Sequence, residues 1–360
     1  MAEAAKVEGF DVVIGYGEIA GADTNELEQK GFKLKHIPMK RGSLNLFYNF
    51  ITILKIWNFF KKEKPDIVHL VTIKPYLYGG IISRFISVPC LVSAVSGLGT
   101  LFISDNLKTK VLLFFLYPIF KFAFNHKNQK VIVQNKDDLK LLEDWGVLKS
   151  EKVKLVKGSG VKLEDYVNLD EPDGMTTICL ACRLLKDKGV FEFVNAARKL
   201  REKGINAKFL LAGDLDIGNP ESLNEHDLNI IKEEGYVEIL GHYDDIPKLY
   251  NRSHIVCLPS YREGLPKSLI EAAAAGRAVV TTDVPGCRDA LIPNVTGLVV
   301  PVKNSGKLAN ALEWLIEHPK ERVSMGRAGR ELAEKEFFVE KIVKNHLEIY
   351  RDLIKNQNRF

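Results

Sequence analysis

Cysteine is scarce in this sequence, and so are the long apolar runs that cross membranes. The five cysteines form an odd set that lies mostly inside apolar runs, as expected for reduced thiols in a core and not for a disulfide framework. They are Cys90, Cys179, Cys182, Cys257 and Cys287. Cys179 and Cys182 form a C-x-x-C pair, but no second ligand pair accompanies it for zinc. No apolar run reaches the roughly 20 residues of a membrane-spanning helix, and the length of 360 residues fits two globular domains.

Acidic side chains are scarce between residues 33 and 130, where 15 basic residues accompany 3 acidic ones, a net charge of +12. The same region contains two apolar, aromatic stretches at 46–60 and 111–124, each interrupted by a lysine. Each stretch forms either an amphipathic helix on an anionic membrane surface or a core-facing helix of its domain. Nucleic acid is not predicted as a partner, because no base-stacking or groove-reading motif accompanies the charge.

Short β-branched runs alternate with amphipathic segments along the chain, as in βαβ units of a parallel sheet. In the first half we predict strands at 11–16, 32–37, 66–71, 90–95 and 130–135, and helices near 22–30, 44–63, 76–86, 107–124 and 136–145. A linker is predicted at 158–175, where Gly, Pro and acidic residues gather. Further strands are predicted at 176–183, 208–214, 236–241, 254–260, 278–283 and 296–302, and the chain is predicted to be helical after Pro319.

The pattern therefore predicts an α/β fold with two doubly wound, Rossmann-like domains that face a central cleft. Their predicted bounds are 1–160 and 161–335, and residues 336–360 are expected to form a helix that crosses back to the first domain. Ligands of such sheets bind outside the carboxyl ends of the strands.

The start of the chain departs from this pattern. The first ten residues predict the last turns of a helix and a glycine turn, which lead straight into the strand at 11–16. A doubly wound domain ordinarily opens with a strand, and that strand is central. We expect a first domain that lacks its opening strand and leaves two strands with unpaired edges. A shortened form or a start codon placed too late explains this, and the alternative is a domain that begins with a helix.

Residues 261–276 read YREGLPKSLIEAAAAG and directly follow a predicted strand. Proline suits the first turn of a helix, and glycine commonly follows its last turn. We therefore predict a helix from near Pro266 to Gly276. Glu263 then lies on the turn before the helix and Glu271 on its second turn. The alternative is a capping acid and a solvated helix acid.

Residues 181–193 read ACRLLKDKGVFEF and predict a strand, a loop and a helix. Arg183 leaves the strand end, and Lys188 with Gly189 opens the helix. Two cations near a helix N-terminus can bind a diphosphate group without the help of a metal ion. The R-x4-K-G spacing alone, however, also fits an arginine and a lysine that are simply solvated. Free backbone N–H groups near Leu265–Ser268 are expected to point to the same space.

Together these segments resemble the family-four retaining glycosyltransferases of the GT-B fold, for which the E-x7-E pattern with its glycine and proline is specific. Segments at 211–214, 241–250, 283–291 and 294–301 fall where that family has similar ones. Bacterial enzymes of O-antigen, capsule and lipid-linked oligosaccharide assembly carry segments similar to 69–80, 96–103, 132–142 and 157–161. The resemblance implies a donor with a nucleotide diphosphate, UDP in particular, and a polyprenyl-diphosphate-linked saccharide as acceptor. It implies a location in the cytoplasm, peripheral on the inner face of the plasma membrane.

The resemblance also implies roles for single residues. Arg183 and Lys188 would neutralise the diphosphate, so that no metal or other cofactor is needed. Glu263 would hold hydroxyls of the transferred sugar, aided by the N–H groups after Gly264, and Glu271 would bind the ribose. The anomeric configuration would be retained, with a phosphate oxygen of the leaving group as the base.

The remaining predicted site residues lie on both sides of the reaction. The donor side is Gly97, Gly99, Gly264, Leu265, Pro266, Ser268 and Glu271, and the acceptor side is His69, Thr72, Lys74 and Ser96. Many relatives have a histidine where this chain has Ser96, and the N–H groups of the following glycine loop are expected to replace it. His69 is the alternative, or else a structural histidine. The rival functions are a UDP-sugar 2-epimerase, which lacks the E-x7-E pattern, and a truncated, inactive partner of a membrane glycan assembly.

Overall fold

The computed structural model describes residues 1–18, 24–40, 45–98, 102, 106–167 and 170–357. Two compact units account for them. The first unit comprises Met1–Val133, Leu139–Val156 and Val343–Phe360, and the second comprises Gln134–Asp138 and Lys157–Ile342.

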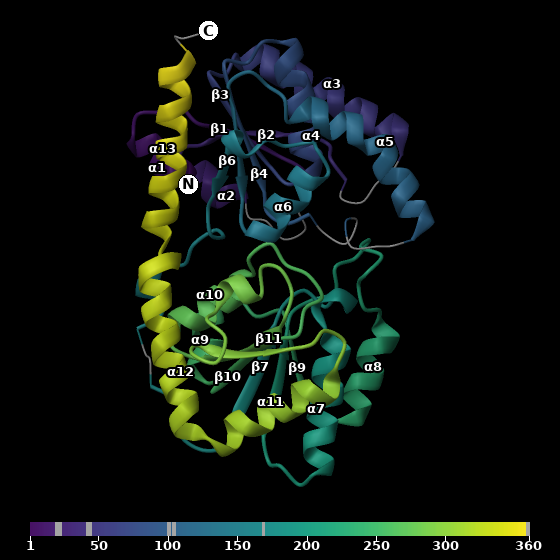
Figure 1. Cartoon of the computed structure of the whole chain (residues 1–360), viewed down its shortest axis with the longest axis vertical. Helices are drawn as coiled ribbons and strands as arrows, with labels where there is room; N and C mark the ends of the chain where they lie inside the picture. Colours follow the sequence, from purple (N-terminus) through teal and green to yellow (C-terminus); the bar gives the residue numbers. More distant parts are fainter. Residues whose placement is uncertain (19–23, 41–44, 99–101, 103–105, 168–169, 358–360) are drawn as a thin grey trace. The chain divides into compact units, whose positions relative to one another are not determined.

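The first unit is an α/β unit with two parallel sheets (Figure 1). Its strands are β1 (Val13–Tyr16), β2 (Lys33–His36), β3 (Ile67–Val71), β4 (Cys90–Val95), β5 (Gln129–Val133) and β6 (Val153–Leu155). Its helices are α1 (Ala2–Val7), α2 (Thr24–Gln29), α3 (Leu46–Glu63), α4 (Ile73–Phe85), α5 (Leu107–Ala123), most of α6 (Lys136–Asp144) and the greater part of α13 (Val339–Gln357). Strands β3 to β6 pair in sequence order, while β1 pairs with β2 in a sheet of their own. Among the described residues, β1 and β3 therefore each keep one open edge, in agreement with the sequence expectation.

Helix α3 shows how the sequence builds this unit. It begins at a cap in which Asn45 accepts a hydrogen bond from the backbone N–H of Tyr48 (3.0 Å). Residues Thr52, Ile56 and Phe60 recur every fourth position and are buried, so they form the stripe that packs on the core. No helix within the described residues is long and apolar enough to cross a membrane.

The second unit is built on one six-stranded parallel sheet with the strand order β12-β11-β10-β7-β8-β9 (Figure 1). Its strands are β7 (Thr177–Ala181), β8 (Lys208–Ala212), β9 (Glu238–Gly241), β10 (Ile255–Leu258), β11 (Ala278–Thr282) and β12 (Gly297–Val300). Its helices are α7 (Val190–Glu202), α8 (Glu225–Glu234), α9 (Ile246–Asn251), α10 (Lys267–Ala274), α11 (Ser305–Glu317) and α12 (Pro319–Leu332). Strands β7, β10 and β11 are buried along their whole length, as expected for the centre of a sheet covered on both faces.

The predicted strands and helices are confirmed, with three corrections. Strand β6 was missed, because three residues are too few to show a period. Helix α4 begins at Ile73 and not near residue 76, since Pro75 falls in its first turn, where proline is tolerated. The helical region after Pro319 is broken at Phe338, which is extended and bridges to Val161. All five cysteines are free, as predicted.

The segment predicted as a linker is held firmly by the second unit. The side chain of Arg277, fully buried, donates to the carbonyl oxygen of Asp170 (2.8 Å). Arg322 donates to both carboxylate oxygens of Glu171 (2.9 and 2.8 Å) and is itself buried. Removing one partner of such a pair leaves an uncompensated buried charge, so these contacts fix the segment.

Gly326 in α12 offers a test of how closely this unit is packed. A Cβ at this position would lie 2.1 Å from the carbonyl oxygen of Gly276, whereas a Cβ at the helical Gly306 would meet only Asn304 Oδ1 at 3.5 Å. We expect Gly326→Ala to lower the free energy of unfolding by about 2 kcal/mol or more. Gly306→Ala is the matched control and should be neutral or stabilising by up to about 1 kcal/mol. Urea denaturation of both variants measures the difference, and equal stabilities would contradict the packing described here.

Candidate active site

The three predicted catalytic residues lie at the carboxyl ends of two neighbouring strands of the second unit. Strands β7 and β10 pair in parallel near the centre of the sheet. Arg183 and Lys188 follow β7, and Glu263 follows β10. Since the carboxyl ends of parallel strands share one edge of the sheet, where α/β proteins bind ligands, this edge is the candidate site.

Lys188 and Glu263 form an ion pair with a distance of 2.5 Å between Nζ and Oε1. Their side chains are only 16% and 12% exposed. Burial alone would lower the pKa of Lys188, but the facing carboxylate outweighs burial and raises it. The lysine therefore stays charged in a site with little water.

Arg183 and Asp187 complete this group of charges. The guanidinium of Arg183 forms an ion pair with Asp216. The pKa of Asp187 is raised, chiefly by burial; Lys188 and Arg183 oppose the shift and Glu263 adds to it. The charges of Arg183, Lys188 and Glu263 all affect the pKa of Asp187, so the three side chains lie close to this one carboxyl group.

The loop that carries Glu263 is clamped by the turn after β11. The backbone N–H of Glu263 donates to the carbonyl oxygen of Pro285 (3.3 Å). Gly286 has a φ of +78°, and a Cβ there would lie 2.4 Å from the carbonyl oxygen of Gly264. Only glycine combines this backbone conformation with this approach.

Residues 134–138, which belong to the second unit, hold the same loop from another direction. The side-chain amide of Asn135 donates to the Gly264 carbonyl oxygen (2.7 Å), and Arg262 forms an ion pair with the fully buried Asp138. Burial raises the pKa of Asp138, and Arg262 opposes that shift. Asn135 and Asp138 were not among the predicted site residues, and the signal for them in the sequence was the segment 132–142, which resembles segments of the family.

Helix α10 places Glu271 as predicted. It begins immediately after Pro266, and Gly276 with a φ of +66° follows its end. Glu271 is 8% exposed, and its carboxylate pairs with Lys267 at 3.1 Å. Burial raises the pKa of Glu271, while the paired Lys267 opposes that shift. Of the other predicted donor-side residues in the second unit, Gly264, Leu265 and Pro266 are buried and Ser268 is half-buried.

The predicted acceptor-side residues lie in the first unit. Thr72 and Ser96 are exposed and follow the neighbouring strands β3 and β4. Thr72 has a φ of +72°, an unusual conformation for a β-branched residue. Lys74 donates to the carbonyl oxygen of Lys40 (2.7 Å). Gly97 has a φ of +121°, and Gly99 lies outside the described residues.

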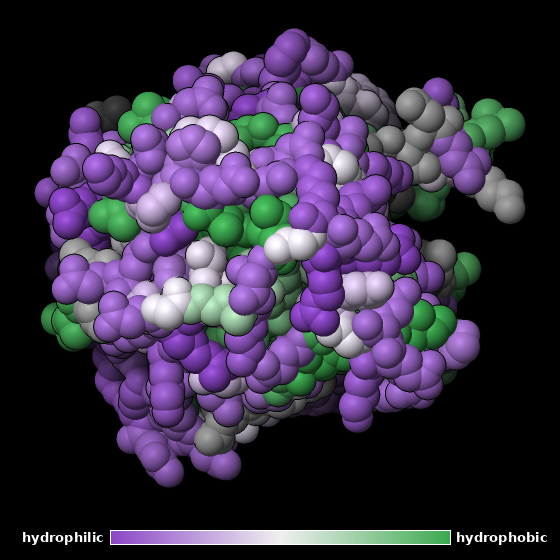
Figure 2. Space-filling view, turned by 90° about the horizontal axis from the view of Figure 1, so that it is seen from below, coloured by the Kyte–Doolittle hydropathy of each residue, from purple (hydrophilic) through white to green (hydrophobic). Residues whose placement is uncertain are grey.

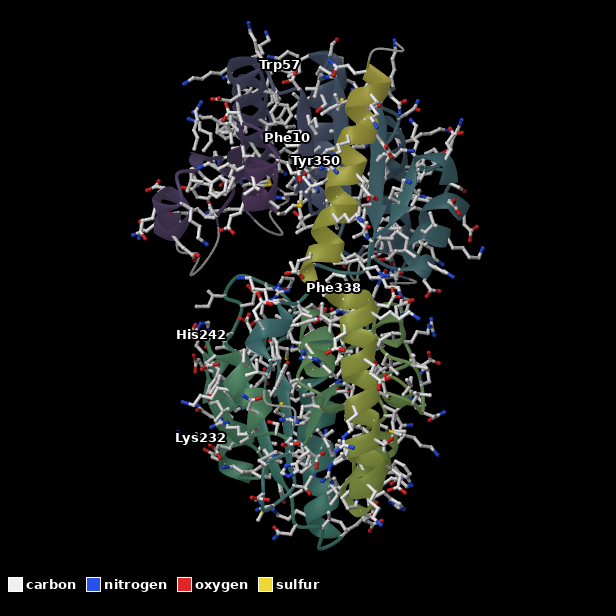
Figure 3. The ribbon with its side chains drawn as sticks, turned by 90° about the vertical axis from the view of Figure 1, so that its left-hand side faces the viewer. Phe10, Trp57, Lys232, His242, Phe338 and Tyr350 are labelled. Atoms are coloured by element: carbon white, nitrogen blue, oxygen red, sulfur yellow. The ribbon has the colours of Figure 1, made fainter. Side chains whose placement is uncertain are left out.

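His69 occupies a different environment. Its Nδ1 is 2.5 Å from the hydroxyl of Tyr350, and its ring stacks on His346 at 5.6 Å. Figure 3 shows Tyr350 on α13 beside Phe10, with a distance of 5.8 Å between the two rings. These contacts favour the structural interpretation of His69 that the sequence left open.

Comparison with known proteins identifies the family. Residues 162–332 match the family model described as glycosyl transferases group 1, and residues 1–135 match the model described as glycosyl transferase 4-like. The chain belongs to the family-four glycosyltransferases of the GT-B fold. The resemblance seen in the sequence is thereby confirmed.

Three bacterial proteins are curated relatives that match most of this glycosyltransferase. The N,N'-diacetylbacillosaminyl-diphospho-undecaprenol alpha-1,3-N-acetylgalactosaminyltransferase of Campylobacter jejuni is 29% identical over 92% of this chain and 89% of its own length. The capsular polysaccharide biosynthesis glycosyltransferase CapM of Staphylococcus aureus is 29% identical over 89% of this chain and 85% of its own. The UDP-Gal:alpha-D-GlcNAc-diphosphoundecaprenol alpha-1,3-galactosyltransferase of Escherichia coli is 24% identical over 89% and 84%.

Solved structures support the fold of this glycosyltransferase. A sucrose-phosphate synthase from Thermosynechococcus elongatus superposes with a TM-score of 0.80 at 19% identity, over 98% of this chain and 92% of its own. Anabaena Alr3699/HepE in complex with UDP-glucose gives 0.76 at 19% identity, over 98% and 93%. At these identities the likeness shows the fold alone.

The environment of His69 predicts loss of stability in acid. Burial, with smaller contributions from His346 and the chain's N-terminal amine, lowers the pKa of His69 from 6.5 to about 3. Between pH 6.5 and about pH 3, His69 is therefore protonated in the unfolded chain but neutral in the folded chain. The free energy of unfolding falls as the pH drops through this range. His69 should account for about 2 kcal/mol of the stability lost between pH 7 and pH 5.

Urea unfolding at both pH values, followed by tryptophan fluorescence, measures this loss. His69→Gln should remove most of it, because a glutamine amide can still form a hydrogen bond with the Tyr350 hydroxyl and does not titrate. His226→Gln, at an exposed position, is the control and should leave the loss unchanged. An equal loss in His69→Gln and the parent chain would refute this account of His69.

Proposed function

We propose that this glycosyltransferase retains the anomeric configuration and moves a hexose or N-acetylhexosamine from a UDP-linked donor to a polyprenyl-diphosphate-linked saccharide. The names of two of the relatives include a diphospho-undecaprenol acceptor, and one of these two includes UDP-Gal. The observation that carries the proposal is the Lys188–Glu263 ion pair at the carboxyl edge of β7 and β10. The product would serve bacterial surface polysaccharide assembly.

In this proposal the second unit binds the donor and the first unit binds the acceptor. Lys188 and Arg183 stabilise the negative charge that develops on the departing diphosphate, and they replace a metal in that task. Glu263 accepts hydrogen bonds from hydroxyls of the transferred sugar. Its contact with Lys188 fixes the carboxylate in place, since a charge-assisted hydrogen bond is both short and strong.

Retention follows if the acceptor hydroxyl attacks from the face that the diphosphate leaves. A phosphate oxygen of the leaving group takes the proton from that hydroxyl, so the protein need not supply a base. The role of the protein is then to hold two substrates in a reactive geometry and to stabilise charge.

The division of labour between Glu263 and Arg183 is testable with purified protein. We expect Glu263→Ala to lower transfer at least about 100-fold, because it removes contacts to the reacting sugar, while UDP affinity stays nearly the same. Arg183→Ala should weaken both transfer and UDP binding. Glu238→Ala is the control, because Glu238 is an exposed carboxylate paired with a lysine in the same unit.

Transfer is measured with radiolabelled UDP-sugars and a lipid-linked acceptor, and UDP binding by thermal shift, both in EDTA. Stabilisation by UDP in EDTA supports binding without a metal. Normal turnover in Glu263→Ala would remove the basis for the assigned roles. Binding that requires added metal would refute the metal-free clamp.

We also propose that the protein is peripheral on the cytoplasmic face of the plasma membrane and binds it through helices α3, α4 and α5. Their exposed apolar residues, named here the aromatic face, are Leu46, Phe47, Phe50, Leu54, Phe85, Leu107, Val111, Leu112, Phe114, Phe115, Ile119 and Phe122. An aromatic chain links the helices, because Phe85 of α4 lies 6.4 Å from Trp57 of α3 and 5.9 Å from Phe122 of α5.

Lysines accompany the aromatic face. Lys55 and Lys61 of α3 and Lys121 of α5 are exposed. Apolar side chains that enter the headgroup region and lysines that meet anionic lipid are the two components of interfacial binding. Another face of the molecule, seen from below in Figure 2, is mostly hydrophilic with scattered apolar residues.

Vesicle binding tests the aromatic face. We expect the protein to sediment with phosphatidylcholine vesicles that contain phosphatidylglycerol, less well at high salt, and poorly with phosphatidylcholine alone. The double variant Phe114→Ser and Phe115→Ser should bind at least about tenfold more weakly, because burial of two phenylalanine rings is lost. Ile217→Ser is the control, since Ile217 is 95% exposed in the second unit. Equal losses in both variants, or none, would contradict the assignment of the membrane-binding surface.

A further inference from the structure

The peptide group between Gly264 and Leu265, in the turn between β10 and α10, is held from several directions. Its carbonyl oxygen, on Gly264, accepts a hydrogen bond from the side-chain amide of Asn135 (2.7 Å). A Cβ at Gly286 would lie 2.4 Å from that oxygen, and a Cβ at Gly158 would lie 2.9 Å from Cδ2 of Leu265. The peptide group therefore has little room to rotate.

The N–H of Leu265 is the other end of this peptide group. The described part of the chain contains no cis peptide bond, and in a trans peptide the N–H points away from the carbonyl oxygen. Leu265 is 7% exposed, and within the described residues its N–H has no hydrogen-bond acceptor. Buried backbone N–H groups are almost always paired, so this one indicates a ligand on the side away from Asn135.

Asn135 is itself fixed at both ends of its amide. It is 1% exposed and directly precedes α6. Its Oδ1 accepts a hydrogen bond from the backbone N–H of Asp138 (2.7 Å), which caps the helix. Its Nδ2 donates to the carboxylate of Asp138 (3.1 Å) as well as to Gly264. Because Oδ1 must accept, the amide has one orientation, with its N–H groups toward Gly264.

We propose that Asn135 is a positioning residue for the donor: it holds the Gly264–Leu265 peptide so that the N–H of Leu265 meets the sugar-bearing phosphate of the nucleotide. This inference rests on the proposed function, in which the second unit binds a UDP-linked donor. It adds a residue from outside the segments at 181–193 and 261–276 that carry the proposed catalytic groups.

An anionic oxygen suits this N–H. Leu265 lies two positions before Lys267, the first residue of α10, and the N-terminal end of a helix favours negative charge. Glu263, two positions earlier, is proposed to hold the transferred sugar, so the nearest phosphate is the one that carries this sugar. A hydrogen bond from an N–H to a phosphate is strong, but it weakens steeply when the N–H is misaligned.

Asn135→Ser separates the two tasks of this side chain. A serine hydroxyl still caps α6 but is one bond too short to reach Gly264. Calorimetry in EDTA measures the affinities for UDP and UMP, which differ only in the terminal phosphate. The parent chain should prefer UDP. The variant should bind UDP about tenfold more weakly, near the lower end for a hydrogen bond to a charged group, because the N–H remains but is no longer held in one orientation. Its affinity for UMP should stay nearly the same.

Asn304→Ser is the matched control. The exposed Asn304 caps α11 in the same unit by accepting a hydrogen bond from the backbone N–H of Lys307 (2.9 Å). This variant should keep the affinities of the parent for both nucleotides. Asn135→Thr also retains a capping hydroxyl and serves as a second variant if Asn135→Ser does not fold. Arg183→Ala is the positive control and should weaken UDP binding.

The outcomes separate the inference from the proposed function. If Arg183→Ala weakens UDP binding and Asn135→Ser binds UDP like the parent, the role of Asn135 is refuted while the proposed function stands. Equal weakening of UDP and UMP in Asn135→Ser also refutes it, because a merely structural role would have that effect. Equal affinity of the parent for both nucleotides would refute the contact with the terminal phosphate. If the parent chain binds no UDP at all, the proposed donor is wrong and this inference fails with it.

Discussion

The candidate site depends on two opposite charges that are buried together. Lys188 and Glu263 come from loops after different strands and meet with their side chains largely removed from water. Neither charge is tolerable there without the other, since an unpaired buried charge costs several kcal/mol. The two loops must therefore be held in register. The pairing of β7 with β10 and the contacts around residues 262–264 provide that register.

Close backbone contact extends this constraint along the edge of the sheet. Gly213 after β8, Gly189 after β7 and Gly286 after β11 all have positive φ, and a Cβ at each would enter the backbone of a neighbouring loop at 1.7, 2.2 and 2.4 Å. Gly213 approaches the loop after β7, and both Gly189 and Gly286 approach the loop after β10. Four adjacent strands, β8, β7, β10 and β11, thus have loops in direct backbone contact. Such packing leaves little room for the charged groups to move and favours preorganised electrostatic stabilisation.

The sequence predicted what local pattern encodes. Proline before and glycine after an alanine-rich run placed α10 and Glu271, and apolar runs located the strands of the second unit. Contacts between distant residues could not be predicted in this way. Nothing local to Asp138 indicates that it pairs with Arg262, and nothing local to Tyr166 indicates that Arg330 ties its carbonyl oxygen to the end of α10. His69 lies in a strand that was predicted, yet its packing against α13 depends on a helix more than 270 residues away, as the 281-residue separation from Tyr350 shows.

The aromatic helices explain why two interpretations of one sequence stayed open. In α3 the buried stripe of Thr52, Ile56 and Phe60 and the exposed residues Phe47, Phe50 and Leu54 lie on different faces of the same helix. A helix that is apolar on both faces carries no periodic signal that assigns one face to the core. The structure shows that α3 both packs on the core and exposes an apolar surface, so the two interpretations are compatible. Large exposed apolar surfaces on a soluble protein commonly mark a site of interaction, and the exposed lysines of α3 and α5 fit an anionic partner better than a neutral one.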